Sequence, residues 1–592
     1  MHKNRVVNKE QAPNKTFTEN ECQWLMRRVY KNPATSAEKL TEMAQNKEFR
    51  QDLPSRNCSK SSELSKIVFT VLALAILVAQ TPSTDGAKIL AVYALPARSH
   101  FMMHRALISE LVKHGHQVTM ITALTLEPQK LGSNYTEILI EPEYDYWKDS
   151  AEKFGANPLF EMKNVVSNLL KLTKIISLTG TEHALKQPKV QDIINAKETE
   201  GVYDLLLVEQ CQQEAFLALA HIYNIPVMSS ATFAQQAYMS QMFGIITPWS
   251  YVPLNILEFT EHMTFWERVQ NTYHSLHYDL YREFKIFPEM DELVKKYFGH
   301  LPIKFPSVSA MDRNLSAILI NNYTPLSSAA PTIDSMINVG GMHIYPPKPL
   351  PTDLQKFLDE GENGAIYFSL GTQVQSKDMA PEKLQIFLDV FRQLKQHVLW
   401  KFENDSIANL PKNVMIKKWM PQNDILAHPN VRVFIAHGGL FGTQEAVYHA
   451  VPILGIPFFF DQYLNLKKAE HGGYAITLDF KTLTSEDLKN GLQQLLYNST
   501  YRDTIKRISR IFRDRPMGPR ETALYWIDYV IRHKGARHLR AAGLDLKWYQ
   551  FYLLDVIALA VAVVVVALGV ALASLRWVLR RIKDGKMKQK VQ

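Results

Sequence analysis

A short apolar run, a glycine turn and a helix follow one another at residues 431–449, and this order constrains the fold more than any other feature of the chain. Residues 431–436 are apolar and β-rich, His437-Gly438-Gly439 is a turn, and residues 441–449 can continue as a helix. The order predicts half of a βαβ unit and hence a parallel sheet. The glycines let the backbone approach a diphosphate, the helix N-terminus offers unpaired N–H groups, and His437 is placed to donate to a phosphate oxygen. The alternative is a turn that only packs a helix closely against a strand.

Two further polar positions suit a nucleotide sugar. Glu445 lies about one helical turn beyond the glycines, where it can accept from a ribose hydroxyl. Asp461 and Gln462 follow the apolar run 452–460, at the predicted carboxyl end of a strand. A carboxylate beside a carboxamide suits a ring of sugar hydroxyls.

The distribution of charge argues against a nucleic-acid-binding protein. With 592 residues, 46% of them hydrophobic, the chain is too long for one core, so we expect at least two domains. Most of the net charge of +9 comes from residues 1–60 and 576–592, and the part between them is close to neutral. Nucleic-acid binding needs a basic patch on the folded body. Cys22, Cys58 and Cys211 are too few for a disulfide framework.

The N-terminal part predicts a targeting segment. Residues 1–66 form a polar extension that we expect to be disordered, and residues 67–86 resemble a signal peptide because of an apolar run behind Lys66. This run lies deep in the chain. Either the true start lies downstream, for example at Met43, or the segment stays as an uncleaved anchor, and we favour a removed signal.

The C-terminal part predicts a membrane anchor. Residues 556–575 contain no charge and are long enough for one transmembrane helix. A basic amphipathic segment at 531–555 precedes this helix, and a basic tail at 576–592 follows it. The tail is expected to be cytoplasmic, because basic residues favour that side.

The order of elements expected at 88–122 predicts the start of a Rossmann-like domain that extends over 87–338. A strand at 88–93, a helix with Ser99 as N-cap, and a strand at 118–122 follow in order. His100 lies in the first turn of this helix, where the helix dipole disfavours the imidazolium and keeps the ring able to take a proton from a hydroxyl. A histidine at a helix start is otherwise more often a surface or capping residue.

A linker rich in proline and glycine, at 339–352, predicts the boundary to a second Rossmann-like domain at 353–530. A strand at 365–369 and the turn Leu370-Gly371-Thr372 open this domain. Trp419 and Gln422 follow a strand at 414–418, where a flat indole is a platform for uracil and the carboxamide can reach the ribose or the base edge. Buried core is the alternative for the tryptophan.

The glycine-turn stretch resembles the signature of the UDP-glycosyltransferase family, closest to its arthropod microsomal members. The matching residues, in order and spacing, are His437, Gly438, Gly439, Glu445, Pro452, Pro457, Asp461 and Gln462. The segment from Gly439 through Gly442 and Thr443 to Glu445 carries the arthropod likeness. Ala436 departs from the pattern, because the family usually has Thr or Ser there, and this affects the expected affinity for the diphosphate.

The resemblance implies a GT-B fold, an α/β architecture of two facing Rossmann-like domains, here with one C-terminal transmembrane helix. His100 would be the general base, oriented by an acidic residue that aligns with Glu209; Glu214 is a rival, and a solvated carboxylate is the alternative. The donor would bind the C-terminal domain through Gly371, Thr372, Trp419, Gln422, His437, Gly438, Gly439, Gly442, Thr443, Glu445, Asp461 and Gln462. The family implies no metal and no cofactor beyond the UDP-sugar co-substrate.

The expected activity is inverting transfer of a sugar from a UDP-sugar to a hydroxyl of a small lipophilic acceptor. Glucose is favoured as the sugar, because Asn321 follows Leu319-Ile320 where vertebrate glucuronosyltransferases place an Arg. The aromatic segment 232–271 suits an apolar acceptor pocket. The rivals are the same transfer from UDP-glucuronate, a catalytically silent UDP-sugar or lipophile-binding relative, and an epimerase or hydrolase.

The topology implies a single-pass type I protein of the endoplasmic reticulum membrane with lumenal catalytic domains. Lys588 and Lys590 resemble a dilysine retrieval signal, although a solvated basic tail would look the same. Glycosylation sequons lie at Asn134, Asn314, Asn322, Asn404 and Asn498. The expected partners are the UDP-sugar, the lipophilic acceptor and the membrane, with a homo-oligomer allowed and no nucleic acid.

Overall fold

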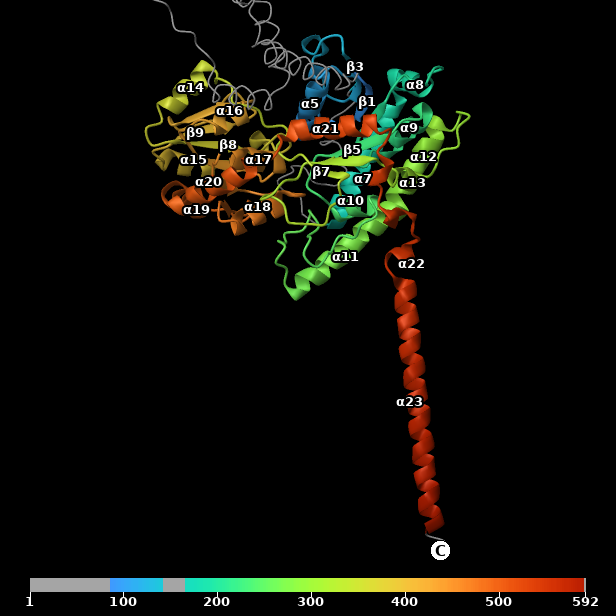
Figure 1. The fold of residues 1–592 in the computed structure, drawn as a ribbon. Coiled ribbons are helices and arrows are strands. Elements are labelled where there is room, and N and C mark those ends of the chain that lie inside the picture. The colour runs from blue at the N-terminus through green and yellow to red at the C-terminus, as the bar shows by residue number, and fades with distance from the viewer. Residues whose placement is uncertain (1–85, 142–165, 590–592) are drawn as a thin grey trace, which may run out of the picture. The chain divides into compact units, whose positions relative to one another are not determined.

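Two parallel β-sheets organise the residues that the structure, a computed structural model, describes, namely 86–141 and 166–589 (Figure 1). The first sheet has the strand order β3-β2-β1-β4-β5-β6-β7 and the second has the order β10-β9-β8-β11-β12-β13. All strand pairs in both sheets are parallel. The predicted extension at 1–66 and nearly all of the signal-like segment at 67–86 lie outside the described residues.

The strands are short and mostly buried on both faces, as parallel strands covered by helices must be. Alternate residues of β1 enter two different cores, because successive side chains of a strand point to opposite faces. The first sheet contains β1 (Lys88–Tyr93), β2 (Gln117–Thr122), β3 (Tyr135–Leu139), β4 (Leu205–Glu209), β5 (Val227–Ala231), β6 (Ala317–Ile320) and β7 (Met336–Asn338). The second contains β8 (Ala365–Ser369), β9 (His397–Lys401), β10 (Val414–Lys417), β11 (Val431–Ala436), β12 (Ile453–Gly455) and β13 (Ala475–Thr477).

Each strand order reverses direction once, and these reversals fix where a ligand can bind. In the first sheet the reversal lies between β1 and β4, and in the second it lies between β8 and β11. The carboxyl ends of the strands at such a switch point leave a crevice between diverging loops. His100 lies in the first turn of the helix after β1, and Glu209 is the last residue of β4. Gly371 and His437 lie in the loops that follow β8 and β11, so the predicted site residues occur at both switch points.

Helices follow most of the strands in both halves, and the helices predicted after Ser99 and at 441–449 correspond to α5 and α17. The first half contains α5 (Arg98–Lys113), α7 (Val166–Lys186), α8 (Pro188–Ile194), α9 (Ala218–Tyr223), α10 (Ala237–Met242), α11 (Phe265–Tyr281), a π-helix η4 (Arg282–Ile286), α12 (Phe287–Phe298) and α13 (Val308–Asp312). The second contains α14 (Thr352–Asp359), α15 (Pro381–Gln393), α16 (Gln422–Leu426), α17 (Leu440–Tyr448), α18 (Gln462–His471), α19 (Ser485–Tyr497) and α20 (Ser499–Arg513).

Two local predictions were wrong. Ser99 is not the N-cap of α5, because the helix already begins at Arg98 and Ala97 takes the capping position without a side-chain bond. The strand expected at 452–460 is only Ile453–Gly455, and Phe460 has a left-handed backbone conformation with φ of 55°. Asp461 therefore lies at the start of α18, beyond a loop, and not at the end of the strand.

Helix α21 (Pro519–Arg532) returns the chain to the first sheet after the second sheet is complete. Its side chains Ala523, Ile527 and Val530 are fully buried in one core with β1 and α5, which Figure 1 shows beside it. The predicted C-terminal domain ends at residue 530, but this helix packs with the N-terminal sheet, because its apolar stripe completes that core.

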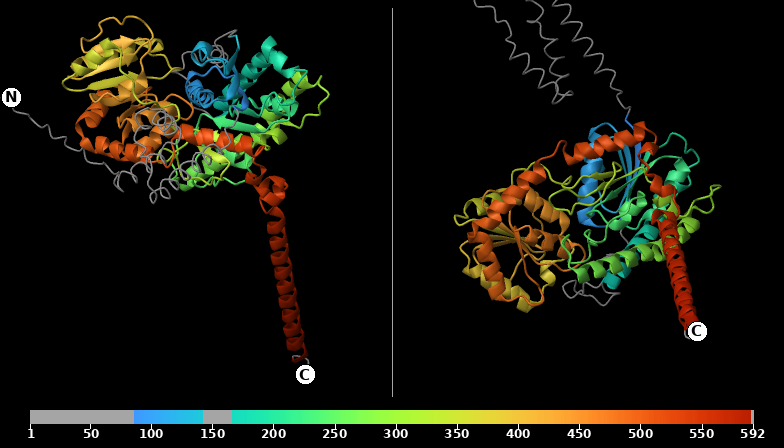
Figure 2. Two further views of the ribbon diagram at one scale, coloured as in Figure 1. Left: turned by 45° about the horizontal axis from the view of Figure 1, so that its top comes forward. Right: turned by 60° about the horizontal axis from the view of Figure 1, so that its bottom comes forward.

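The C-terminal end contains a helix that can cross a membrane. After the short helix α22 (Trp548–Phe551), α23 extends over Leu554–Gln589. Its part Leu554–Lys583 has a mean hydropathy of 3.1 over its most apolar window and is not buried against other described residues. Figures 1 and 2 show that this helix extends away from the two sheets. The expected span at 556–575 lies within it.

Candidate active site

A single large cavity joins the two switch points. Its volume is about 1370 Å³, and residues from loops of both sheets line it. Pockets for one drug-sized ligand typically have roughly 300–1,000 Å³. The cavity therefore has room for two substrates side by side, one against each sheet.

His100 and Glu209 meet at the first switch point. His100 lies in the first turn of α5, and its Nδ1 is 2.5 Å from Oε1 of Glu209 at the end of β4. The imidazole is partly exposed to the cavity, whereas Glu209 is buried. Since Nδ1 faces the carboxylate, Nε2 is the ring nitrogen left for a substrate. The arrangement matches a base held in one tautomer by a carboxylate.

Glu209 is kept ionised by its neighbours. Burial alone would raise its pKa, but the imidazoles of His100 and His104 and a hydrogen bond from Thr232 together lower the pKa below its ordinary value. The second carboxylate oxygen, Oε2, has no hydrogen-bond partner among the described residues. A positive charge that forms on His100 is therefore met by a ready counter-charge.

Sequence reasoning missed His104, which belongs to the same cluster. Its Nε2 lies 3.9 Å from Oε1 of Glu209, and its ring stacks on Tyr93 with centroids 3.6 Å apart. Burial lowers the pKa of His104 to about 4, so the ring is neutral and adds no charge that would compete with His100. The spacing of four between the two histidines, which puts both on one helix face, is the signal that could have found it.

The rival Glu214 has other partners. Its Oε1 accepts from Arg282 at 3.0 Å and from Gln210 at 3.1 Å, and Arg282 also contacts Asp312 at 3.0 Å. All three charged groups are buried. Glu214 thus belongs to an ion-pair cluster in the wall of the cavity, and Glu209 is the carboxylate that contacts His100.

His437 lies at the second switch point, between two glycines. A Cβ on Gly371 or on Gly439 would come within 2.5 Å of the His437 ring, so these two positions accept no side chain without moving the imidazole. Burial lowers the pKa of His437 to about 4, and its Nδ1 has no hydrogen-bond partner in the described part of the chain. The ring is therefore neutral and fixed, with an unpaired nitrogen beside the glycine turn, as a phosphate ligand requires.

Two of the predicted donor residues do not line the cavity. A Cβ on Gly438, which has φ of +84°, would collide with Leu466 of α18, so this glycine allows close packing of turn and helix. Thr443 is buried, and its hydroxyl donates to the carbonyl of Gly439 inside α17. At Gly438 the packing alternative for the glycine turn thus holds, whereas Thr372, Gly439 and Gly442 do line the cavity.

The predicted base and ribose side of the site is formed by Trp419, Gln422 and Glu445. Trp419 lines the cavity with 71% of its surface exposed, so the buried-core alternative is wrong. Gln422 Nε2 donates to Glu445 Oε2 at 2.5 Å. Burial raises the pKa of Glu445 to about 7, and the bond from Gln422 opposes this rise. An exposed flat ring beside a poorly solvated carboxyl group leaves room and hydrogen-bonding capacity for a nucleoside.

Asp461 and Gln462 reach the cavity from the start of α18. Burial raises the pKa of Asp461, whose Oδ2 accepts from Asn465 at 2.8 Å. The side-chain oxygen Oε1 of Gln462 accepts hydrogen bonds from the backbone N–H of Phe458 and of Phe459. The NH₂ group of the same side chain is left for a ligand. The pair therefore offers one acceptor and one donor, although it follows a loop and not a strand.

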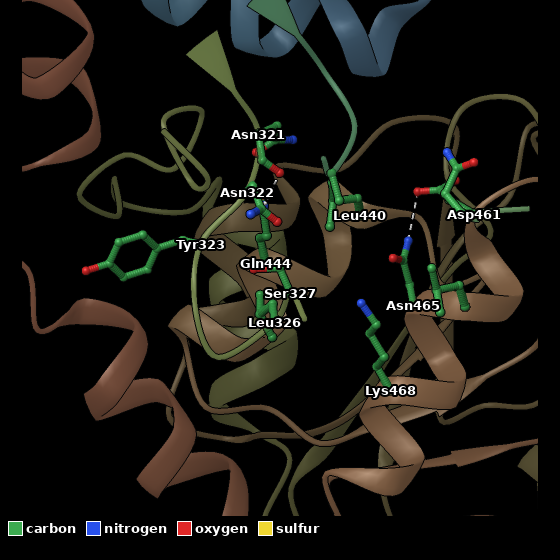
Figure 3. A pocket seen from close by; sticks show the side chains of 13 residues that line it. Asn321, Asn322, Tyr323, Leu326, Ser327, Leu440, Gln444, Asp461, Asn465 and Lys468 are labelled. Atoms are coloured by element: carbon green, nitrogen blue, oxygen red, sulfur yellow. Dashed lines mark hydrogen bonds between the residues drawn. The ribbon is translucent and has the colours of Figure 1, made fainter. Parts of the chain in front are cut away.

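A second, small cavity of about 20 Å³ adjoins Asp461 (Figure 3). Asn321 lines it and is buried, with Nδ2 donating to the carbonyl of Thr232 at 2.9 Å. The ammonium group of Lys468 points into the same cavity from α18. Burial lowers the pKa of Lys468 to about 8, and Glu261 opposes this change. Asn321 itself provides no cation in this cavity, but the ammonium group of Lys468, from α18, lies in the same cavity.

The acceptor side is less extensive than the aromatic segment 232–271 suggested. Phe233, Tyr238 and Ile256 line the large cavity, together with Tyr278 from α11. The stretches 247–253 and 263–268 do not line it, and Trp266 points outward with 69% of its surface exposed. This side of the pocket wall is therefore made by α10, the loops before and after it, and the inner face of α11.

One group of side chains near His100 could hold a metal ion, and most of the glycosylation sequons are accessible. Among the described residues, the side chains grouped closely enough to hold a metal ion are His100, Glu209 and Cys211, whose ligand atoms lie within 4.8 Å of one another. The sequon at Asn322 is buried, with its Nδ2 donating to Asn338, so it is not accessible to a glycosylating enzyme. The other sequons are partly or fully exposed.

The chain is similar in sequence to one family of known proteins. The sequence pattern of the family described as UDP-glucoronosyl and UDP-glucosyl transferase matches residues 87–589. The chain is 34% identical over 496 residues to UDP-glucosyltransferase 2 of Dactylopius coccus, which covers 83% of this chain and 92% of that protein. It is 31% identical over 510 residues to UDP-glucuronosyltransferase 2B15 of Homo sapiens, which covers 83% and 94%.

Solved structures agree in fold. The glycosyltransferase VinC in complex with DTDP superposes with a TM-score of 0.52 at 15% identity, covering 75% of this chain and all of that one. The calicheamicin glycosyltransferase CalG4 gives a TM-score of 0.50 at 17% identity, with coverages of 76% and 99%. With two doubly wound parallel sheets, the expected GT-B fold is confirmed.

Proposed function

The chain belongs to the UDP-glucoronosyl and UDP-glucosyl transferase family and is a glycosyltransferase with a UDP-sugar donor, and on that premise we propose that it transfers the sugar, with inversion, to a hydroxyl of a small lipophilic acceptor. The observation that carries the proposal is the His100–Glu209 pair, which faces the same cavity as the glycine turn of the second sheet. A silent binding protein has no need for a base with an ionised partner at this point.

In this mechanism, Nε2 of His100 takes the proton of the acceptor hydroxyl. The oxygen attacks the anomeric carbon from the face opposite UDP, the bond to the diphosphate breaks, and UDP leaves with the bonding electrons. Glu209 is a positioning residue, because it fixes the tautomer of His100 and stabilises the imidazolium. Negative charge on the leaving diphosphate is met by the N-terminus of α17, His437 and Thr372. No metal or further cofactor is part of the proposal.

Donor contacts divide between the base, the ribose and the sugar. Trp419 stacks on uracil, Glu445 accepts from a ribose hydroxyl, and Asp461 with Gln462 binds sugar hydroxyls. Gly371, Gly439 and Gly442 keep the backbone free for the diphosphate, while Gly438 and Thr443 act through the packing of the turn. Phe233, Tyr238 and Tyr278 form the apolar side for the acceptor.

Glucose is the donor sugar that we favour, because Asn321 supplies no cation for a carboxylate. UDP-glucuronate is the second candidate, and Lys468 is the observation in its favour, since its ammonium group points into the cavity beside Asp461. A Lys468→Gln variant would then lower glucuronide formation and leave glucoside formation unchanged.

The location that we propose is the endoplasmic reticulum membrane, in type I orientation with lumenal sheets. The apolar helix α23 and the basic residues 576–592 behind it support this orientation. Lys588 and Lys590 support retrieval to that compartment.

The test is product formation by the full-length protein in membranes. UDP-glucose, UDP-glucuronate and UDP-N-acetylglucosamine are offered separately with a panel of phenols and steroids, and wild type is compared with His100→Ala. We expect glucoside from the wild type and a loss of about 10²–10⁴-fold in the variant, with UDP binding retained. Transfer that survives in His100→Ala would refute the mechanism, and UDP binding without product from any donor would favour a silent binder.

A further inference from the structure

Helix α11 and the π-helix η4 that continues it expose an apolar stripe. The stripe consists of Trp266, Val269, Tyr273, Leu276, Leu280 and Phe284, each between 43% and 69% exposed. These residues recur at intervals of three and four, so they lie on one side of the helix. An exposed contiguous apolar surface of this kind marks a contact with a partner or a membrane.

The opposite side of the same helix faces the protein. Asn271, Ser275 and Arg282 are buried, and Tyr278 and Arg282 line the large cavity. At about 100° per residue, these positions point roughly 180° away from the stripe. The stripe is therefore not an exposed part of the core, because α11 already has its own buried face. Glu283, which precedes Phe284 in η4, is bound by Arg313 and Ser309.

The segment that leads into the membrane helix packs against the loops that follow α10 and α13. A Cβ on Gly244, in the loop after α10, would collide with Leu544, and Arg540 donates to the carbonyl of Arg313 at 3.0 Å. Burial and the nearby charge of Asp279 in α11 raise the pKa of Tyr552, which lies just before α23. Figures 1 and 2 show α11 and α22 at the same end of the first sheet's half of the molecule.

The surface between α11 and α23 is also suited to a bilayer interface. Ile246 and Tyr251, in the loop that contacts the segment before α22, are exposed, and so are Leu546, Trp548 and Leu553. Tryptophan and tyrosine favour the headgroup level of a membrane, where an apolar ring and a polar edge are both accommodated. The stripe thus continues toward the point at which the chain would enter the bilayer.

We propose that the apolar stripe of α11 and η4 lies in the headgroup region of the bilayer that α23 crosses. The proposal rests on the membrane anchorage proposed above. The lipid surface is the occupant because Tyr552, at the entry to α23, lies near Asp279 of α11, so that the stripe is close to the point where the chain enters the bilayer. One face of α11 then contacts lipid while the other forms the wall of the acceptor pocket. Lipophilic acceptors dissolved in the bilayer would reach the pocket beside this helix.

Photo-crosslinking in the full-length protein tests the contact. p-Benzoylphenylalanine replaces Tyr273, in the centre of the stripe, in protein reconstituted into phosphatidylcholine bilayers, and adducts are identified by mass. The matched control is the same probe in place of Thr272, which is also exposed but is turned by about 100°. A probe in place of Val563 of α23 reports the anchorage itself. A probe in place of Glu486, an exposed residue of α19, reports random lipid contact.

We expect phospholipid adducts at positions 273 and 563, with roughly tenfold less at 272 and 486. Lipid adducts at 563 without any at 273 would overturn the proposal and leave the anchorage intact. No lipid adduct at 563 would overturn the anchorage and, with it, this proposal. A crosslinked dimer through position 273 would assign the stripe to a second copy of the chain and would equally overturn it.

Discussion

The two switch points each contain a histidine, and the two histidines differ in almost everything except their residue type. His100 is partly exposed and bound to an ionised carboxylate, whereas His437 is enclosed by two glycines and has no acidic partner. The first can gain a proton because Glu209 compensates the charge. The second stays neutral, since burial lowers its pKa to about 4, and can act only as a hydrogen-bonding group. In the proposed mechanism, the surroundings and not the imidazole therefore decide which of the two histidines transfers a proton.

The largest expected effect comes from making His100 resemble His437. Glu209→Gln keeps the shape of the side chain but removes the charge that stabilises an imidazolium, so kcat should fall by about 10²–10⁴-fold. The affinity for UDP, measured by calorimetry on the same preparation, should be unchanged and serves as the folding control. If the variant kept the kcat of the wild type, the charge of Glu209 would not be what distinguishes His100 from His437.

A smaller effect is expected from moving His437 without changing it. Gly439 has φ of −61°, which alanine adopts without strain, but the added Cβ would lie 2.5 Å from Nε2 of His437. Gly439→Ala should therefore displace the ring and weaken UDP binding by up to about 10²-fold. Gly442→Ala, at the start of α17, is the comparison variant, since its Cβ would lie 3.3 Å from Nε2 of Gln422 and 3.5 Å from Phe434 and would not approach His437. Equal losses in both variants would show that the glycines, and not the histidine, matter.

The smallest expected effect concerns pH at the donor half. The pKa of Glu445 is raised by burial from 4.5 to about 7, so this carboxyl group becomes a full acceptor for a ribose hydroxyl only as pH rises through 7. The KM for the UDP-sugar should fall several-fold between about pH 6 and about pH 8. Glu445→Gln, which keeps an acceptor for Gln422, should remove this dependence. A KM that varies with pH equally in both proteins would exclude Glu445 as its source.

The same group predicts a change in stability of the unliganded protein. A carboxyl whose folded pKa lies above its unfolded value is destabilising once it ionises, so the free energy of unfolding should fall as pH rises from about 4.5 toward 7 and then level off. The full shift corresponds to about 3 kcal/mol. Glu445→Gln should therefore melt at a higher temperature than wild type at pH 8 while binding UDP less tightly.

Local patterns predicted much of the fold and many positions of the candidate site. The strands at 88–93, 365–369 and 431–436 are confirmed at those bounds, because apolar runs between glycine or polar turns leave few alternatives. His100 lies at a helix start, Trp419 lies just beyond a strand end and Glu445 lies within α17, and all three line the large cavity. The roles of these residues remain predictions. The short strand β12 was overestimated, because an apolar loop and an apolar strand have the same composition.

By itself, the sequence determined the strand–turn–helix units, the switch-point residues and the apolar C-terminal helix, because each of these depends on the order of neighbouring residues. Only the tertiary structure decided which carboxylate contacts His100, that Gly438 packs while Gly439 lines the cavity, that Lys468 points in beside Asn321, and that α21 returns to the first sheet. These facts depend on contacts between residues far apart in the chain. Such contacts follow from how the helices pack on both faces of each sheet, which no local pattern specifies.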